Sequence, residues 1–310
     1  MNIVFLGQYD NGGVLSMYAD VINKYTQHKA NAIVGNDQYG HHSDIIIRGV
    51  KWGRDRERKP SQRIKTAFDI LGGADVIVAR DGDIKISNDL DWTDFVTGPI
   101  VNFYGDVQNT VHITRKCFTN QPQIHEQHSS IEFIPTAISN IEKIIEGTSL
   151  QDGKEIIVSH STLDRYNKNT ESFLLVMSYL MKNYNNINYD IIENCSYWET
   201  IMKKSLSNIG VDHIHEKNRY YGISSLENSA LGLINITHLS DGDIKLIMGF
   251  FDMKCFLWET VSNEGELYRC VEKYIEDRDL LLEKRKETQQ WFLSYWDNKR
   301  IAKKLIDFLL

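Results

Sequence analysis

Short apolar runs alternate with amphipathic helical patterns along most of the chain, and this alternation restricts the fold most strongly. The predicted strands occupy residues 3–6, 32–34, 44–47, 75–79, 99–104, 131–134, 156–159, 189–192 and 233–236. The predicted helices between them occupy residues 14–25, 61–71, 171–184 and 198–206. Short strands that alternate with helices form mostly parallel, doubly wound sheets. We therefore predict an α/β protein.

The pattern changes once near the middle of the chain. Residues 144–155 lose hydrophobic periodicity and gain Gly, Ser and Asp, as an interdomain linker does. We expect one Rossmann-like domain over residues 1–148 and a second over residues 149–290, with long helices over 264–286 and 289–310. Ligands of such sheets bind at the carboxyl ends of the strands, so we expect the two domains to face each other across a binding crevice.

Composition excludes several classes of protein. The chain has 310 residues, which is long enough for two domains. Its formal net charge of -7 argues against a general nucleic-acid binder. Four cysteines stand far apart with no C-x-x-C pair, which is typical of reduced thiols in a cytoplasmic protein. The short apolar run at the start indicates a first strand rather than a signal peptide, and no run is long enough for a membrane span.

The segment YYGISSLENSALG, residues 220–232, has the features of a ligand site. Gly222 leads into a short helical stretch that carries one carboxylate, Glu227. The start of a helix exposes free N–H groups and the positive end of its dipole, so it suits an anion such as a diphosphate. A carboxylate about one turn inside can accept hydrogen bonds from two ribose hydroxyls. Taken alone, the segment fits an ordinary buried helix equally well.

Two cations, Arg165 and Lys168, lie between the predicted strand 156–159 and the helix 171–184. The planar guanidinium and the compact ammonium both suit phosphate oxygens. An R-x-x-K pair by itself is more often a solvated basic loop. Its position after a strand, ahead of the glycine–helix segment, is what favours a binding role.

Together these segments resemble the GT-B glycosyltransferases, specifically the retaining nucleotide-sugar enzymes of the family 4 (group 1) type. In that family the second domain begins with a strand, a loop that carries Arg and Lys, and a helix. A later segment reads glycine, hydrophobic residue, Ser-x-Leu-Glu-x-x-Ala-Leu-Gly, which residues 222–232 match. The order and spacing match over most of residues 150–240. The last helix, residues 291–310, resembles the C-terminal helix that packs back toward the first domain in this family.

The resemblance implies roles for the residues of the second domain. Arg165 and Lys168 would bind the donor diphosphate and stabilise the leaving group in place of a metal ion. Glu227 would bind the donor ribose. The backbone N–H groups around Ser224 and Ser225 would contact the phosphates.

The resemblance also implies the reaction. A hexosyl or pentosyl group would pass with retention, and without a cofactor or metal, from a UDP- or GDP-linked sugar to an acceptor hydroxyl. Gly12 and Gly13 would form a glycine-rich loop that faces donor and acceptor, because glycine lets a ligand approach the backbone closely. The first domain would hold the acceptor, a carbohydrate, a lipid-linked sugar or another hydroxyl compound; a nucleic-acid acceptor is disfavoured but stays open.

Two positions depart from the family pattern. Many relatives carry a second Glu eight residues before the ribose-binding one, where this chain has Arg219. Many also carry a His-Gly turn in the first domain, where this chain reads Tyr104-Gly105-Asp106. Asp106 either orients an acceptor hydroxyl, faces the donor sugar, or is a simple turn residue. The departures leave open a non-catalytic sugar- or nucleotide-binding relative and a sugar-nucleotide epimerase, although the R-x-x-K pair with Glu227 favours a transferase.

Several other polar residues allow both a functional and a structural interpretation. The triplets Asp81-Gly82-Asp83 and Asp241-Gly242-Asp243 fit a divalent cation or ordinary turns, and we predict turns and no metal. A zinc site from Cys117, His125 and His128 lacks a fourth ligand. His160 follows a strand and fits a ligand contact or a hydrogen-bonded structural histidine. The basic run from Lys51 to Lys59 fits an anionic acceptor, a peripheral membrane contact or a solvated loop.

Overall fold

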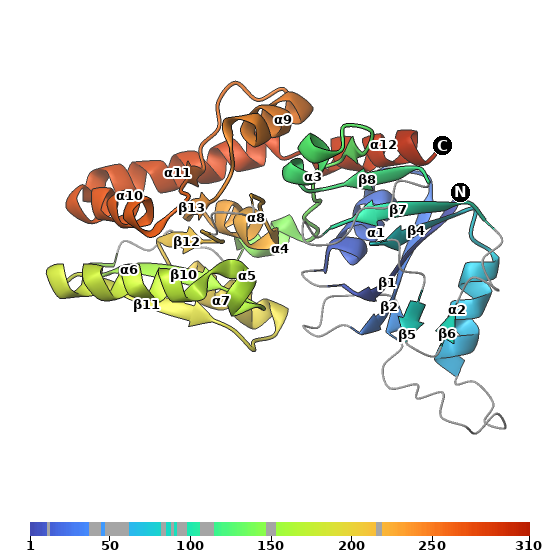
Figure 1. The fold of residues 1–310 in the computed structure, drawn as a ribbon, viewed down its shortest axis with the longest axis horizontal. Helices are drawn as coiled ribbons and strands as arrows, with labels where there is room; N and C mark the ends of the chain where they lie inside the picture. The colour runs from blue at the N-terminus through green and yellow to red at the C-terminus, as the bar shows by residue number, and fades with distance from the viewer. Residues whose placement is uncertain are drawn as a thin grey trace. The chain divides into compact units, whose positions relative to one another are not determined.

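The computed structural model describes residues 1–10, 13–36, 45–46, 62–81, 85–87, 90–91, 98–105, 115–146, 153–214 and 219–310. The chain divides into two compact units: Met1–Ser139 with Asn298–Leu310 form unit 1, and Asn140–Asp297 form unit 2 (Figure 1). Each unit contains a parallel sheet with helices, which confirms the predicted α/β class with two Rossmann-like domains. Gly12, Asp106 and the run from Lys51 to Lys59 lie outside the described residues.

Unit 1 is built on a seven-stranded sheet in the order β3-β2-β1-β4-β7-β8-β9, in which all the paired strands are parallel. Its strands are β1 (Asn2–Tyr9), β2 (Lys29–Asn36), β3 (Ile45–Ile46), β4 (Val76–Arg80), β7 (Ile100–Tyr104), β8 (Cys117–Thr119) and β9 (Glu132–Phe133). Its helices include α1 (Val14–Tyr25), α2 (Gln62–Gly72) and α3 (Pro122–Gln127), and β5 (Lys85–Ser87) pairs antiparallel with β6 (Leu90–Asp91). The sheet extends from β1 in both directions, as a doubly wound fold requires.

The last helix, α12 (Asn298–Leu309), belongs to unit 1 and packs on α1 (Figure 1). Asn298 anchors its first turn: its Oδ1 accepts from the Ile138 N–H at 3.1 Å and its Nδ2 donates to the Ile138 carbonyl at 2.7 Å. Lys304 pairs with Glu132, and the Phe308 ring meets Phe118 edge-on. These contacts confirm the prediction that the C-terminal helix packs back toward the first domain.

Three helices replace the two long ones predicted for the C-terminal region, namely α10 (Glu264–Glu276), α11 (Arg278–Tyr295) and α12. Asp277 makes the first break because its carboxylate caps α11 by accepting the Leu280 N–H at 2.9 Å. Trp296 makes the second break with a non-helical backbone, and its ring stacks on Trp258 and Phe292. Capping and aromatic packing therefore end helices that the hydrophobic pattern alone would continue.

Unit 2 contains a five-stranded sheet in the order β11-β10-β12-β13-β14, again with all the paired strands parallel. Its strands are β10 (Ile156–Ser161), β11 (Ile187–Ile192), β12 (Ile209–Val211), β13 (Ile234–Thr237) and β14 (Glu259–Thr260). The helices are α4 (Ile141–Glu146), α5 (Arg165–Lys168), α6 (Thr170–Asn183), α7 (Tyr197–Ser205), α8 (Ile223–Ala230), α9 (Asp241–Phe251), α10 and α11. Because the strands are parallel, the loops after β10, β12 and β13 emerge at one edge of the sheet.

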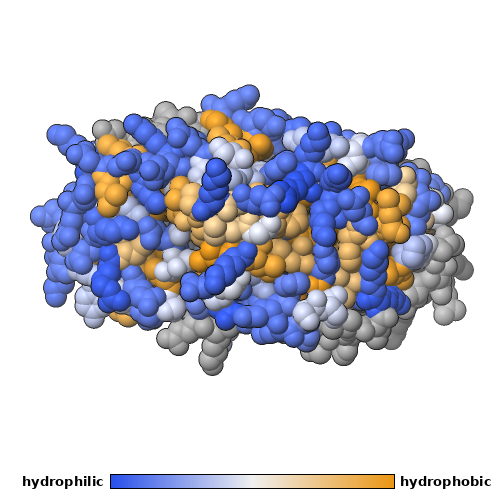
Figure 2. Space-filling view, turned by 90° about the horizontal axis from the view of Figure 1, so that it is seen from above, coloured by the Kyte–Doolittle hydropathy of each residue, from blue (hydrophilic) through white to orange (hydrophobic). Residues whose placement is uncertain are grey.

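The surface is mixed in character. On the face that Figure 2 shows, hydrophilic residues surround patches of hydrophobic residues. Among the described residues, no helix combines the length and the apolar character that a membrane crossing needs.

Candidate functional site

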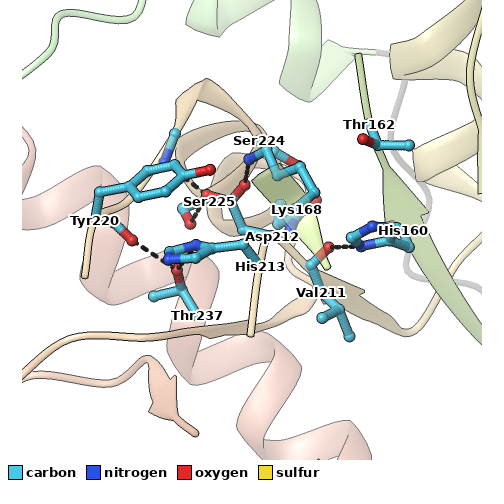
Figure 3. Close-up of polar contacts among 12 residues, drawn as sticks. His160, Thr162, Lys168, Val211, Asp212, His213, Tyr220, Ser224, Ser225 and Thr237 are labelled. Atoms are coloured by element: carbon cyan, nitrogen blue, oxygen red, sulfur yellow. Dashed lines mark hydrogen bonds and ion pairs between the residues drawn. The ribbon is translucent and has the colours of Figure 1, made fainter. Parts of the chain in front are cut away.

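The start of helix α8 lies beside the residues that follow β10 and β12 (Figure 3). Gly222 is its N-cap, and within the part of the chain that the structure describes the backbone N–H groups of Ile223 and Ser224 make no hydrogen bond. A Cβ on Gly222 would lie 3.1 Å from Lys168 Nζ and 3.2 Å from Asp212 Oδ2. Glycine therefore permits a close approach here, and the first turn of α8 presents free donors and a positive dipole end.

A partly buried ion pair joins Lys168, the last residue of α5, to Asp212, the first residue after β12 (Figure 3). The second carboxylate oxygen of Asp212 accepts from the Gly222 N–H and from Ser225 Oγ, each at 2.6 Å. Burial disfavours the charged carboxylate, but Lys168 and these donors hold the pKa of Asp212 well below its usual range. Burial also opposes the ammonium, yet Asp212 raises the pKa of Lys168 above its ordinary value. Both groups are therefore ionised.

A second buried ion pair involves Glu227, the predicted ribose-binding residue. Lys204 of α7 places Nζ 2.6 Å from Glu227 Oε2 and 2.8 Å from Ser224 Oγ. The side chains of Lys204 and Glu227 are only 1% and 5% exposed. The start of α8 thus lies beside two cation–carboxylate pairs, one through Lys168 and one through Lys204.

Arg165 begins the same short helix that ends with Lys168, but its side chain binds elsewhere. Its Nε and Nη2 donate to the two carboxylate oxygens of Glu193, just after β11, at 2.9 and 2.8 Å. The Arg165 side chain is 48% exposed and has a further contact with Glu171 at 3.7 Å. Within the described residues, the structure gives Lys168, but not Arg165, a contact beside the α8 start.

His160 is fully buried, which favours a hydrogen-bonded structural histidine over a ligand contact. Its Nδ1 donates to the Val211 carbonyl at 3.0 Å, its Nε2 accepts from Thr170 Oγ1 at 3.0 Å, and its ring stacks on Phe173. Only a neutral imidazole can donate at one nitrogen and accept at the other. Burial accordingly lowers the pKa of His160 to about 4. Its position after a strand therefore reflects a structural role.

We expect His160 to make the stability of the protein depend on pH. The unfolded chain binds a proton at this imidazole below pH ~6.5, but the folded protein does so only below about 4. The free energy of unfolding should therefore fall as the pH drops from 6.5 toward 4, by about 2 kcal/mol between pH 7 and pH 5, and stay constant above this window. Urea unfolding at both pH values tests this, because His160→Asn should abolish this part of the loss.

A His128→Asn variant, which leaves His160 unchanged, is the matched control for that measurement. A wild-type pH dependence in the His160→Asn variant would contradict the assignment of a neutral buried histidine.

No protein-family model matches the sequence, and no curated protein matches it. Solved structures are nevertheless similar to it over nearly its whole length. The Anabaena protein Alr3699/HepE in complex with UDP and glucose superimposes with a TM-score of 0.63 at 13% identity, over 99% of this chain and 98% of that one. A glycosyltransferase from Rickettsia africae gives 0.60 at 12% identity, over 99% and 97% of the two chains.

A UDP-GlcNAc 2-epimerase from Neisseria meningitidis bound to UDP-GlcNAc is also similar, with a TM-score of 0.53 at 12% identity over 99% of both chains. All three agreements span the sheets and helices of both units. The chain has the GT-B fold. At such low sequence identity, the structural similarity establishes the fold alone.

In unit 1, the carboxylate of Asp10 accepts hydrogen bonds at the start of α1. Asp10 Oδ1 accepts from the Leu15 N–H at 2.9 Å, and its Oδ2 accepts from the Ser16 N–H at 3.1 Å and from Ser16 Oγ at 2.7 Å. Gly13 adopts a left-handed backbone with φ of 73°, which favours glycine. Gly13 therefore has a conformational reason to be glycine, and Asp10 satisfies the N–H groups of Leu15 and Ser16 in the first turn of α1.

Arg219 pairs with Asp243 of the second Asp-Gly-Asp triplet, with Nε 3.2 Å from Oδ2. Asp243 also forms a capping box with Ser240 at the start of α9, which explains the triplet as a helix start. In the first triplet, Asp81 Oδ1 accepts the Gly105 N–H at 3.1 Å.

The remaining metal candidates also have structural partners. His125 Nδ1 bonds to the Ile131 carbonyl at 2.6 Å, and Cys117 lies buried in β8. Across the described ranges, no cluster of three or more His, Cys, Asp or Glu side chains could hold a metal ion.

Sequence reasoning missed Asp212 and Lys204. Asp212 follows a strand of only three residues, β12, which was not predicted, and a polar residue at the end of a strand would have been the signal. Lys204 lies in a correctly predicted helix, next to a second lysine, and nothing local distinguishes the buried one.

Proposed function

We propose that this protein is a glycosyltransferase that moves a sugar from a nucleoside-diphosphate sugar to an acceptor hydroxyl. One observation carries the proposal: free N–H groups at the start of α8, the cation Lys168 and the carboxylate Glu227 lie together in the second unit of a GT-B fold. These groups match the diphosphate and the ribose of such a donor. The Anabaena structure of the same fold contains UDP and glucose.

In this proposal the diphosphate accepts hydrogen bonds from Ile223 and Ser224 N–H and from Lys168 Nζ. As the glycosidic bond breaks, negative charge grows on the leaving diphosphate, and the ammonium and the helix dipole stabilise that charge. Glu227 accepts from the ribose hydroxyls. Arg165 contributes as a second cation if it exchanges Glu193 for phosphate, since its bonds to Glu193 lie at a half-exposed position.

We further propose transfer with retention and without a metal, as in the family 4 type that the α8 segment resembles. Cationic side chains and the N–H groups of the helix then stabilise the negative charge of the leaving diphosphate, as a divalent metal ion does in metal-dependent enzymes. The first unit, including the loop at Gly12 and Gly13 and the residue Asp106, would serve the acceptor.

The proposal is tested by incubating the protein with UDP- and GDP-linked sugars and a panel of carbohydrate and lipid-linked acceptors. We expect acceptor-dependent release of one nucleotide, a product with the donor's anomeric configuration, and equal rates with and without EDTA. Loss of activity in EDTA would remove the metal-free part. An epimerised nucleotide sugar in place of a transfer product would favour the second candidate, an epimerase, which the Neisseria structure of the same fold supports.

A further inference from the structure

The buried pair of Lys204 and Glu227 is not explained by folding alone. A salt bridge enclosed at this depth contributes little net stability, because desolvation offsets the attraction between the charges. We propose that Lys204 is a positioning residue that holds Glu227 in place for the donor ribose, so that the protein selects ribose over 2′-deoxyribose. This inference rests on the function proposed above and assigns a specificity role within that site.

Burial makes a cation necessary at Glu227. A carboxylate that is 5% exposed has lost most of its contact with water, so it needs a close positive charge to compensate. The titratable groups that face it are Lys204, which touches it at 2.6 Å, and Lys168 and Tyr197, which interact with it electrostatically. Lys168 is bound to Asp212, so Lys204 is the cation that pairs with Glu227 and fixes the position of its Oε2.

The geometry leaves half of the carboxylate for a ligand. Lys204 binds Oε2, whereas Oε1 makes no hydrogen bond among the described residues. The same ammonium bonds to Ser224 Oγ, so it links Glu227 to the turn whose N–H groups are free. A ribose hydroxyl can donate a hydrogen bond to Oε1 of Glu227. A 2′-deoxyribose lacks one of the two hydroxyl donors, so it would leave the buried carboxylate with fewer hydrogen bonds.

The neighbouring Lys203 provides a matched control within the same helix. Its side chain is 37% exposed, with Nζ 3.9 Å from Glu199 and 3.3 Å from Cys195 Sγ. Lys203→Met therefore makes the same chemical change one residue away, without touching Glu227.

The test compares the dissociation constants of UDP and GDP with those of their 2′-deoxy counterparts, measured by titration calorimetry on the full chain. For wild type and Lys203→Met we expect a preference for the ribonucleotide of about tenfold or more. Lys204→Met should bring this ratio close to one, because Glu227 then lacks the partner that fixes the position of its carboxylate. A wild-type ratio in Lys204→Met would overturn the proposal.

Two further variants keep the test decisive if Lys204→Met does not fold. Lys204→Arg retains a cation and should keep the ribose preference. Lys204→Met with Glu227→Gln removes both charges, so it should fold and lose the preference; a retained preference would overturn the proposal. The outcome for the proposed function is separate: if wild type binds none of these nucleotides, that function fails, whereas wild-type selectivity that survives in Lys204→Met refutes only the role of Lys204.

Discussion

A Lys168→Met variant is expected to bind nucleoside diphosphates about 100-fold more weakly than wild type, because a charge-assisted bond to phosphate contributes roughly 1.5–3 kcal/mol. Lys168 is the cation beside the free N–H groups of α8, with its ammonium bound to Asp212. Titration calorimetry with UDP and GDP measures the loss. Uridine and guanosine, which carry no phosphate, should bind both proteins equally, so the effect is confined to the diphosphate.

Arg165→Met is the matched control for this change. This substitution removes the half-exposed ion pair between Arg165 and Glu193. We expect the affinity for UDP and GDP to fall by less than about tenfold. Lys168→Met also leaves the fully buried Asp212 without its cation, at a cost of about 3–5 kcal/mol in stability. Adding Asp212→Asn should restore stability without restoring affinity. Wild-type affinity in folded Lys168→Met would contradict the assignment of the phosphate site.

Asp212→Asn should change affinity in the opposite direction. The Asp212 carboxylate occupies Lys168 and the Gly222 N–H, the groups that neighbour the proposed diphosphate position. Removing its negative charge frees the ammonium for a ligand, so we expect UDP or GDP to bind about tenfold more tightly or better. The ligand-free variant should lose about 3–5 kcal/mol of unfolding free energy, because Lys168 then lacks its counter-ion.

Urea unfolding with and without nucleotide measures both effects of Asp212→Asn. Nucleotide should return more stability to this variant than to wild type, since a ligand that binds only the folded state stabilises it in proportion to its affinity. Asp10→Asn, which removes the corresponding helix-start carboxylate of unit 1, is the control and should leave nucleotide affinity unchanged. An equal or weaker affinity in Asp212→Asn would show that Asp212 does not compete with the ligand.

Periodicity in the sequence predicted much of the fold. The pattern over residues 14–25 coincides with α1, and the strand predictions in both halves fall on strands of the parallel sheets. Breaks inside continuous helical patterns were not visible, because Asp277 and Trp296 act through a cap and through an aromatic cluster assembled from distant segments. The strand β12 was missed because three residues carry too little periodic signal.

The site was predictable where the motif is local. The α8 segment placed Gly222, Ser224 and Glu227 on one helix start, as the structure does. Their charge partners were not predictable, since Lys204 and Asp212 come from other parts of the chain. Arg165 illustrates the same difficulty: its spacing from Lys168 suggested a shared ligand, but its side chain reaches Glu193 at the end of another strand.

The most direct test of the account is a crystal structure of the protein with bound UDP or GDP. The account predicts that the diphosphate lies at the start of α8, within hydrogen-bond distance of the Ile223 and Ser224 N–H groups and of Lys168 Nζ, with the ribose hydroxyls on Glu227. A nucleotide bound elsewhere, or a Glu227 that stays out of reach of the ribose, would contradict it.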